Sequence, residues 1–438
     1  MSFFVFAQSL VKKFGATQVL YVFLLGLMPL SRFVFPKVKT RTTALLIHLT
    51  YGISMCLFLF QQRILFAIGF ALIMFPFLDK KPSFVFAFGF VINSIIHIYH
   101  MFFGPKQWSM EITGTCLCIF QKIISVSYNI YDGKQRKLGK KPHEAYEFFA
   151  LDEKPTILEW FSYCFTAYGG TTGPFYEYRV FIEMITCHER KPIPNDSIHT
   201  KKSIQRYLGS FLWAGITLLS FKFANYNSYF SEFYLSKPYI IRNLLMCIYT
   251  IFQLVRYFTA WYAVEAGLYQ LGICENPSIS FDSVSNLSII DVLKSDSLSA
   301  WIQNWNHTTH LFWKKYLFMR IKNAGYGTTI AFYSVFIASA VWHGFRPIYY
   351  LFLFDSFIAM MLDKRVRQYN FGNSKYIAIT KNVIVVYIML GATSSWWYST
   401  AESYFYVRNT FLWLPQILSL VLLVITKIIP PPTKPKVQ

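Results

Sequence analysis

Residues 338–354 read ASAVWHGFRPIYYLFLF, and this stretch decides the class of protein to which the chain is assigned. It places His343, Gly344 and Arg346 among aliphatic and aromatic side chains. If 328–343 forms a membrane-spanning helix, His343 lies near its end. Ionisable residues in such helices are rare and usually face a cavity or a partner, so His343 is a candidate functional residue. For a lone histidine, the alternative is a structural role in which the ring bonds to a backbone carbonyl.

The composition indicates a membrane protein. Of the 438 residues, 54% are hydrophobic and only 14% are charged, whereas soluble domains carry about 25% charged residues. The length alone would suggest about three soluble domains. The hydropathy instead favours one membrane domain that extends over residues 1–438.

A membrane-spanning helix needs roughly 20 mostly apolar residues, and about ten segments approach that requirement. Segment 107–130 is moderately apolar and is predicted to be an interfacial or re-entrant helix. We therefore expect an all-α polytopic membrane protein with about ten transmembrane helices plus short interfacial or re-entrant helices. The candidate spans are 17–35, 43–61, 63–78, 83–103, 209–224, 240–267, 301–324, 328–343, 347–362, 375–397 and 408–429.

The net charge of +21 indicates contact with anions. Nucleic acid is not an expected partner, because the sequence has neither a soluble basic face nor a binding module. Basic loops instead face anionic lipids and the cytosol, which predicts a cytosolic position for 133–142. The C-terminus carries Lys434 and Lys436 in a Lys-x-Lys-x-x pattern of endoplasmic-reticulum retrieval, which requires a cytosolic C-terminus. A solvated basic tail explains these lysines equally well.

The sequence predicts no metal site and no disulfide framework. Seven cysteines, an odd number at irregular spacing, are expected to be core thiols. His97 and His100 are three positions apart, but no third ligand accompanies them. N-glycosylation sequons occur at Asn195, Asn286 and Asn306. The sequon at Asn306 lies in a tryptophan-rich segment and is expected to be accidental. The basic loop around Asn195 argues against a luminal position for that residue.

A second group of polar residues precedes His343 by one helix and a turn. The segment SAWIQNWNHTTHLFWKKYLFMRIK, 299–322, contains Asn306 and His310 among tryptophans. Asn306 and His343 are 37 positions apart (343 − 306), which suffices for a helix, a turn and a second helix to return the chain to the same depth. His310 lies one helical turn after Asn306, whereas His307 would point about 100° away.

Two of these blocks, NWNHTTHLFWKKYLF and SAVWHGFRPIYYLFLF, together resemble the signature of the membrane-bound O-acyltransferase family. The Pro-x-Tyr-Tyr continuation after the histidine is similar to that of the lysophospholipid acyltransferase branch. TTGPFYEYRVFIEM at 171–184 resembles a block of its lysophosphatidylinositol acyltransferases, and SYNIYDGK at 127–134 resembles a block that precedes it in this branch.

The resemblance implies a helical bundle around a central catalytic chamber in the endoplasmic-reticulum membrane. It implies transfer of a polyunsaturated acyl group from acyl-CoA, as a co-substrate without a further cofactor, to a lysophospholipid, most specifically lysophosphatidylinositol. The expected catalytic residues are His343 and Asn306. The expected substrate-binding residues are Trp305, His310, Trp342, Gly173, Pro174, Tyr178, Arg179 and Arg346.

These residues suit the chemistry that the resemblance implies. A glycerol hydroxyl is a poor nucleophile and needs a base within hydrogen-bond reach, a contribution of about 10²–10⁴ in rate. A neutral imidazole at His343 would serve, and the amide of Asn306 would orient the hydroxyl, the imidazole or the thioester oxygen. Because a thiolate is a good leaving group and no nucleophile-elbow serine is present, we expect direct transfer without an acyl-enzyme.

Other functions stay open at this point. The acceptor head group could be choline, ethanolamine or serine instead of inositol. A membrane transporter is the non-enzymatic alternative, with His343 and Asn306 along its pathway. That class favours paired intramembrane carboxylates or internal repeats, and the sequence shows neither. The basic residues Lys314, Lys315, Arg320 and Lys322 are predicted to attract CoA phosphates or, equally, lipid phosphates.

Overall fold

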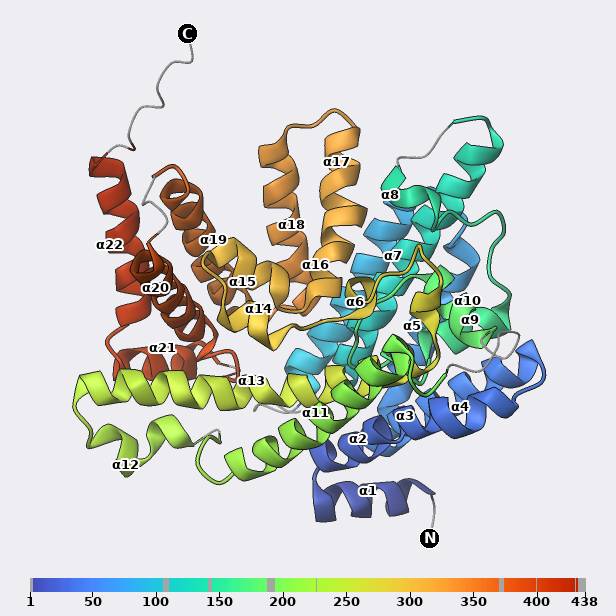
Figure 1. Cartoon of the computed structure of the whole chain (residues 1–438), viewed down its shortest axis with the longest axis horizontal. Helices are drawn as coiled ribbons and strands as arrows, with labels where there is room; N and C mark the ends of the chain where they lie inside the picture. The colour runs from blue at the N-terminus through green and yellow to red at the C-terminus, as the bar shows by residue number, and fades with distance from the viewer. Residues whose placement is uncertain are drawn as a thin grey trace.

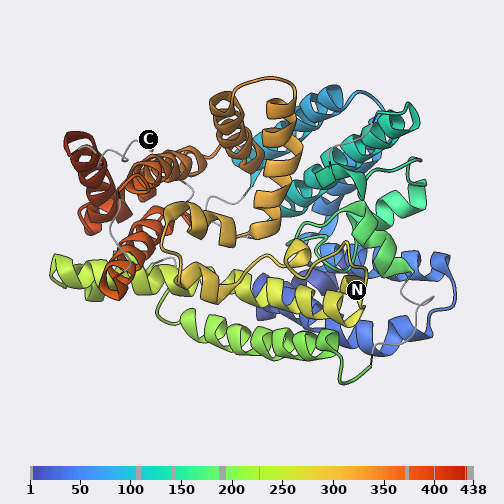
Figure 2. The ribbon, with the colours of Figure 1, turned by 45° about the horizontal axis from the view of Figure 1, so that its top comes forward.

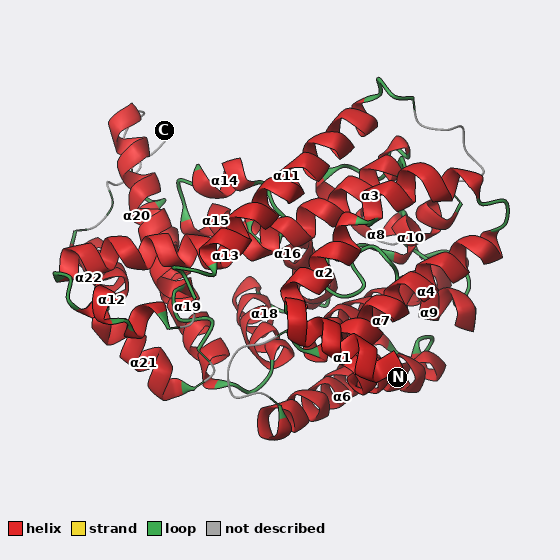
Figure 3. Ribbon diagram, turned by 90° about the horizontal axis from the view of Figure 1, so that it is seen from below, coloured by secondary structure: helices red, strands yellow, loops and turns green. Residues whose placement is uncertain are grey.

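The computed structural model describes residues 3–104, 110–140, 144–186, 194–225, 227–369, 374–398, 400–429 and 431. Within these ranges every regular element is a helix, and Leu287 and Trp305 form one isolated antiparallel bridge. The predicted all-α class is confirmed, and ribbons coloured by secondary structure show it directly (Figure 3). The predicted C-terminal retrieval signal lies outside the described residues.

The first half of the chain forms the helices α1 to α10, several of them joined by short 3₁₀ or π turns. Side chains define some of their ends: the Thr40 hydroxyl accepts from Thr43 N–H at the start of α4, and Thr156 with Glu159 forms a capping box at α9. The helices are α1 Phe3–Phe14, α2 Ala16–Leu25, α3 Leu27–Pro29, α4 Arg41–Phe60, α5 Ile64–Met74, α6 Pro82–Phe103, α7 Ile112–Lys137, α8 Glu144–Glu147, α9 Ile157–Cys164 and α10 Tyr178–Ile185.

The second half forms α11 to α22 and the π-helical segment η9. The elements are α11 Ile198–Ser220, α12 Glu232–Leu235, α13 Tyr239–Gln270, α14 Ile289–Leu293, α15 Leu298–Asn304, α16 His307–Trp313, η9 Lys314–Phe318, α17 Met319–Asn323, α18 Thr328–His343, α19 Pro347–Val366, α20 Lys375–Thr393, α21 Ala401–Thr410 and α22 Leu414–Ile428. Pro347 begins α19 and Pro415 lies in the first turn of α22, where a missing N–H costs no helical hydrogen bond.

Five segments in the described part of the chain are long and apolar enough to cross a membrane. They are Ala16–Lys37, Arg41–Phe77, Pro82–Phe103, Tyr239–Gln270 and Lys375–Thr393. The number rises to six if α21 and α22, which meet at 79°, form one broken span. The chain is therefore a multi-pass helical membrane protein, whereas the count of about ten crossings stays a prediction.

The predicted segments and the helices of the structure differ in places. Segments 43–61 and 63–78, expected as separate spans, correspond to the separate helices α4 and α5, although the short turn Gln61–Arg63 joins them into one apolar segment, Arg41–Phe77. Segment 301–324, expected as one continuous span, is divided at Trp305 and Asn306 into α15 and α16. The basic segment 133–142, expected on the cytosolic side, begins within a helix, because α7 continues to Lys137.

Two large groups of helices have their own buried cores, and a smaller third core joins α12, α13 and α21. The first core is built largely by α2, α4 to α7, α9 and α10, and the second by α13, α15, α19, α20 and α22. The long helices α11 and α13 pack side by side along one edge (Figure 1). Helix α18 contacts both α6 and α19, and the ribbon seen from above places it between the two groups (Figure 2). Its C-terminal end thus reaches the region where both groups meet.

Candidate active site

A cavity of about 290 Å³ lies where the two helix groups meet, and we call it the chamber. Both His343 and Asn306 line the chamber, although they come from different segments. The polar side chains in its wall are Thr17, Tyr21, His97, His100, Glu111, Thr113, Gln121, Thr171, Thr172, Arg256, Tyr257, Asn286, Asn306, Thr309, His343, Arg346 and Tyr349. The predicted catalytic residues therefore share one cavity with many hydrogen-bonding groups.

The last turn of α18 holds His343 at the chamber wall. The side-chain amide of Asn93 on α6 donates to the carbonyl of Trp342, at 3.1 Å. The indole Nε1 of Trp342 donates to the carbonyl of Leu117 on α7, at 3.3 Å. Because both bonds involve the residue next to His343, they fix the end of α18 against two neighbouring helices.

Glycine is required directly after His343. Gly344 has a φ of +109°, a backbone conformation that residues with a side chain rarely adopt. A Cβ at this position would lie 2.6 Å from Nδ1 of His97. The glycine after His343 therefore has two physical causes: the chain turns sharply after α18, and α6 approaches this turn closely.

Aromatic rings surround the His343 imidazole. Its ring centroid lies 4.6 Å from that of Trp342, 5.5 Å from that of Tyr349 and 5.4 Å from that of Trp396. These rings belong to α18, α19 and the segment after α20. They restrict the orientation of the imidazole and limit the access of water to it.

Asn306 lies at the turn between α15 and α16. Its φ of +49° is left-handed, and asparagine is one of the few residues with a side chain that visit this region routinely. Asn306 is the residue before α16, yet its side chain does not cap that helix. The amide is therefore free of the usual capping role, at a position that faces the chamber.

The first turn of α16 is also attached to α7. The amide nitrogen of Gln121 donates to Oγ1 of Thr309 at 3.2 Å, and both residues line the chamber. This bond ties the Asn306 turn to the helix whose Leu117 carbonyl receives Trp342. Helix α7 thus contacts both segments that carry the predicted catalytic residues.

Arg346 and Glu111 form an ion pair in the chamber wall. Their nearest side-chain atoms, Nη2 and Oε1, are 3.3 Å apart, and the two side chains are only 16% and 9% exposed. His100 lies on the same side, with its Nδ1 3.9 Å from the other carboxylate oxygen. The chamber therefore offers a hydrogen-bond donor and an acceptor next to each other.

The predicted substrate-binding residues divide into two sets. Gly173, Trp342 and Arg346 line the chamber together with the catalytic pair. Trp305, His310, Pro174, Tyr178 and Arg179 are not among the lining residues. For this second set, substrate contact stays a prediction without support from the chamber wall.

Residues of the second set have other partners. The ring of Trp305 stacks on Trp301, with centroids 5.7 Å apart, and lies 5.4 Å from that of Trp261. Tyr178 packs edge-on against Tyr163. Arg179 donates to the carbonyl of Ala150 at 3.3 Å. Pro174 follows Gly173 through a cis peptide bond.

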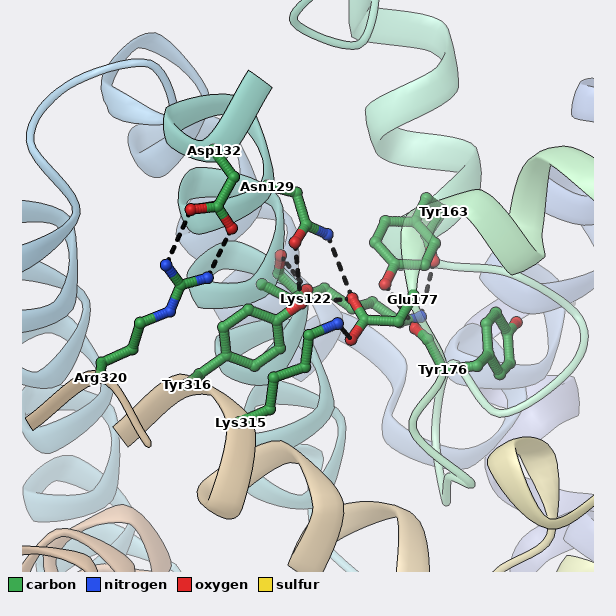
Figure 4. Close-up of polar contacts among 10 residues, drawn as sticks. Lys122, Asn129, Asp132, Tyr163, Tyr176, Glu177, Lys315, Tyr316 and Arg320 are labelled. Atoms are coloured by element: carbon green, nitrogen blue, oxygen red, sulfur yellow. Dashed lines mark hydrogen bonds and ion pairs between the residues drawn. The ribbon is translucent and has the colours of Figure 1, made fainter. Parts of the chain in front are cut away.

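A buried polar network joins three segments of the chain (Figure 4). The Glu177 carboxylate accepts from Nζ of Lys315 at 2.8 Å, from the hydroxyl of Tyr316 at 2.6 Å and from the amide of Asn129 at 3.1 Å. Lys122 of α7 donates to the carbonyls of Tyr163 and Cys164 nearby. The three blocks 127–134, 171–184 and 304–318 therefore meet in one hydrogen-bonded cluster.

The network also changes the role expected for two basic residues. Lys315 and Arg320 were predicted to attract phosphates, but they pair with Glu177 and Asp132 and are only 14% and 15% exposed. Lys314 and Lys322 are exposed, and contact of these two residues with phosphates stays a prediction.

Comparison with known proteins shows the family. The model of the membrane-bound O-acyltransferase family matches residues 115–400. The chain is 28% identical over 312 residues to the human membrane-bound glycerophospholipid O-acyltransferase 2. The aligned region covers 66% of this chain and 57% of the relative. Lysophospholipid acyltransferase 6 of Drosophila melanogaster is 24% identical, with coverage of 58% and 37%.

A fission-yeast protein gives a similar result. The lysophospholipid acyltransferase of Schizosaccharomyces pombe is 24% identical over 275 residues, which are 59% of this chain and 53% of the relative. The chain thus spans about half the length of the curated relatives it matches. The matched region includes Gly173, Asn306 and His343, which line the chamber, and the chain belongs to the membrane-bound O-acyltransferase family.

Proposed function

We propose that the protein transfers a fatty acyl group from acyl-CoA to the free hydroxyl of a lysophospholipid. The observation that carries this proposal is the shared position of His343 and Asn306 in one chamber. The names of the relatives, lysophospholipid acyltransferase and glycerophospholipid O-acyltransferase, support the choice of substrate class.

The reaction needs one base and one leaving group. The neutral imidazole of His343 accepts the proton of the glycerol hydroxyl as its oxygen attacks the thioester carbonyl. The new ester C–O bond forms, the C–S bond breaks, and CoA leaves as a thiolate that the imidazolium can protonate. The Asn306 amide supports this step by donating to an oxygen of the acceptor or of the thioester.

We further propose that the acceptor is lysophosphatidylinositol and that the acyl group is polyunsaturated. The similarity of 171–184 to a block of lysophosphatidylinositol acyltransferases supports the head group. The adjacent donor and acceptor of Arg346 and Glu111 also suit an inositol ring, whose hydroxyl groups both donate and accept. The head groups choline, ethanolamine and serine are the alternatives. Residence in the endoplasmic reticulum with a cytosolic C-terminus is part of the same proposal.

The decisive experiment uses the purified full-length protein in lipid nanodiscs. Radiolabelled acyl-CoA is offered with a panel of lysophospholipids, and the labelled diacyl product is separated and counted. We expect transfer by the native protein and a loss of about 10²–10⁴ in rate for His343→Ala. His199→Ala, a histidine outside the chamber wall, is the matched control and should retain activity.

Two results would overturn the proposal. Undiminished transfer by His343→Ala would reject the assignment of the base. No transfer to any lysophospholipid by correctly folded native protein would reject acyl transfer and favour the transporter alternative.

A further inference from the structure

Asn286 lies in the chamber wall, outside the blocks 127–134, 171–184, 304–318 and 338–354. It belongs to the segment between α13 and α14, is only 1% exposed and lines the chamber beside Gly173. Its side-chain nitrogen would lie 3.5 Å from a Cβ placed on Gly173. Its Asn-Leu-Ser sequon has no bearing on glycosylation in the folded protein, because the amide is enclosed.

The side chain of Asn286 holds the first turn of α16. Its Oδ1 accepts from the backbone N–H of Thr308 at 3.1 Å and from the hydroxyl of Thr308 at 2.5 Å. Its backbone carbonyl accepts from the N–H of His307 at 3.0 Å. Three hydrogen bonds thus reach the two residues that directly follow Asn306.

These bonds replace the cap that Asn306 does not provide. The first N–H groups of a helix have no partner within it, and the Asn306 side chain leaves them unbonded. Asn286 supplies the missing acceptor from another segment. The left-handed turn at Asn306 can therefore persist while its own amide faces the chamber.

Asn286 is itself anchored on α13. Its backbone N–H donates to Oε1 of Glu265 at 2.8 Å, and the second carboxylate oxygen of Glu265 pairs with Nε of Arg206 at 2.9 Å. Glu265 is fully buried, so this support is rigid. Helices α11 and α13 thereby determine where Asn286 lies.

Thr308 also forms a hydrogen bond with the wall segment that contains Phe175. Its Oγ1 accepts from the backbone N–H of Phe175 at 2.9 Å while its hydroxyl proton goes to Asn286. Phe175 follows the Gly-Pro pair and also lines the chamber. One threonine therefore links three wall segments, those of Asn286, Asn306 and Phe175.

We propose that Asn286 is the positioning residue for Asn306: through Thr308 it sets the place and direction of the Asn306 amide in the chamber. This inference rests on the proposed acyl transfer. A displacement of a reacting or orienting group by about 1 Å can cost 10²-fold in rate. Loss of the Asn286 side chain should therefore lower kcat and leave the KM for acyl-CoA almost unchanged.

The test is a double-mutant cycle in the full-length protein, measured by acyl transfer in nanodiscs. Asn286→Leu and Thr308→Val should each lower kcat by about 10- to 100-fold. Because both remove the same contact, the double variant should lose no more than the worse single variant. Thr308→Ser, which retains the hydroxyl, should keep most of the activity.

Asn243→Leu is the matched control, since Asn243 is also buried and hydrogen-bonded but lies outside the chamber wall. A native-like kcat of Asn286→Leu, or a loss in the double variant equal to the product of the two single losses, would overturn the inference. Neither result would affect the proposed function, which acyl transfer by the unmutated protein supports. Equal losses in Thr308→Ser and Thr308→Val would also overturn it. If Asn286→Leu does not fold, Thr308→Val and Thr308→Ser decide the question alone.

Discussion

Arg320 donates two hydrogen bonds to the carboxylate of Asp132, at 2.8 and 2.5 Å, across 188 positions of the chain. This paired geometry is specific to a guanidinium and a carboxylate. The two side chains are 15% and 5% exposed, and the pair joins α17 to α7. It thus fastens the segment after Asn306 to the helix that contacts both parts of the site.

The Asp132–Arg320 pair should contribute strongly to stability. Arg320→Lys cannot reproduce the two parallel bonds, and Asp132→Asn leaves a guanidinium largely buried without its anion. Breaking a buried pair from one side costs about 3–5 kcal/mol. We expect a clear fall in the thermal unfolding midpoint of Asp132→Asn in detergent.

The control for this prediction is the pair of Arg136 and Asp152, which is 35% and 49% exposed. Exposed pairs contribute about 0–1 kcal/mol, so Asp152→Asn should change the midpoint little. Equal effects at both pairs would contradict the prediction.

Glu177→Gln should lower activity as well as stability. The glutamine removes the negative charge that Lys315 needs in a site where both side chains are largely buried. The Phe175 segment, only two positions away, lines the chamber. Transfer rate and unfolding midpoint measured on the same samples would check this, with the exposed Glu147→Gln as control. A variant with native rate and midpoint would show that the charge is dispensable.

Gly344→Ala should impair catalysis more than folding. The added Cβ would meet the His97 ring at 2.6 Å, and the backbone has a φ of +109°, so the turn must move and carry His343 with it. We expect at least a tenfold lower kcat, since misplacement of about 1 Å can cost 10²-fold.

Gly215→Ala tests whether this effect is specific. Gly215 lies within α11, and a Cβ added there would meet open space; alanine favours a helix over glycine by about 1 kcal/mol. This variant should be as active as the native protein and at least as stable. Similar losses in both variants would indicate a general sensitivity to alanine.

Arg346→Met should change the preference among lysophospholipids. The substitution removes the donor next to Glu111 and leaves the hydrophobic part of the side chain in place. Transfer to lysophosphatidylinositol should fall more than transfer to lysophosphatidylcholine, measured as the ratio of the two kcat/KM values. An unchanged ratio would remove Arg346 from head-group recognition.

The helical class and the two predicted catalytic residues, His343 and Asn306, follow from the sequence for identifiable physical reasons. Apolar runs of sufficient length report membrane helices directly. A histidine within such a run stands out because burial of an ionisable group is costly, and His343 does line the chamber. Asn306 becomes a candidate because its distance from His343 along the chain allows both to lie at the same depth, and because the block around it resembles the family signature.

The division of 301–324 could not be predicted from local sequence. Its hydropathy and periodicity continue across Asn306, and the turn is held by Asn286, 20 positions earlier (306 − 286). The same limit applies to Lys315 and Arg320, whose acidic partners lie 138 and 188 positions away. From the sequence alone, a basic residue that binds phosphate cannot be distinguished from one that pairs with a carboxylate far along the chain.

The chamber draws its lining from both helix groups, from Thr17 near the N-terminus to Trp396 near the C-terminus. Neither half of the polypeptide, synthesised separately, would enclose a reaction space. Two halves expressed together would regain turnover only after reassociation in the bilayer, so complementation between inactive fragments would report directly on assembly of the native interface.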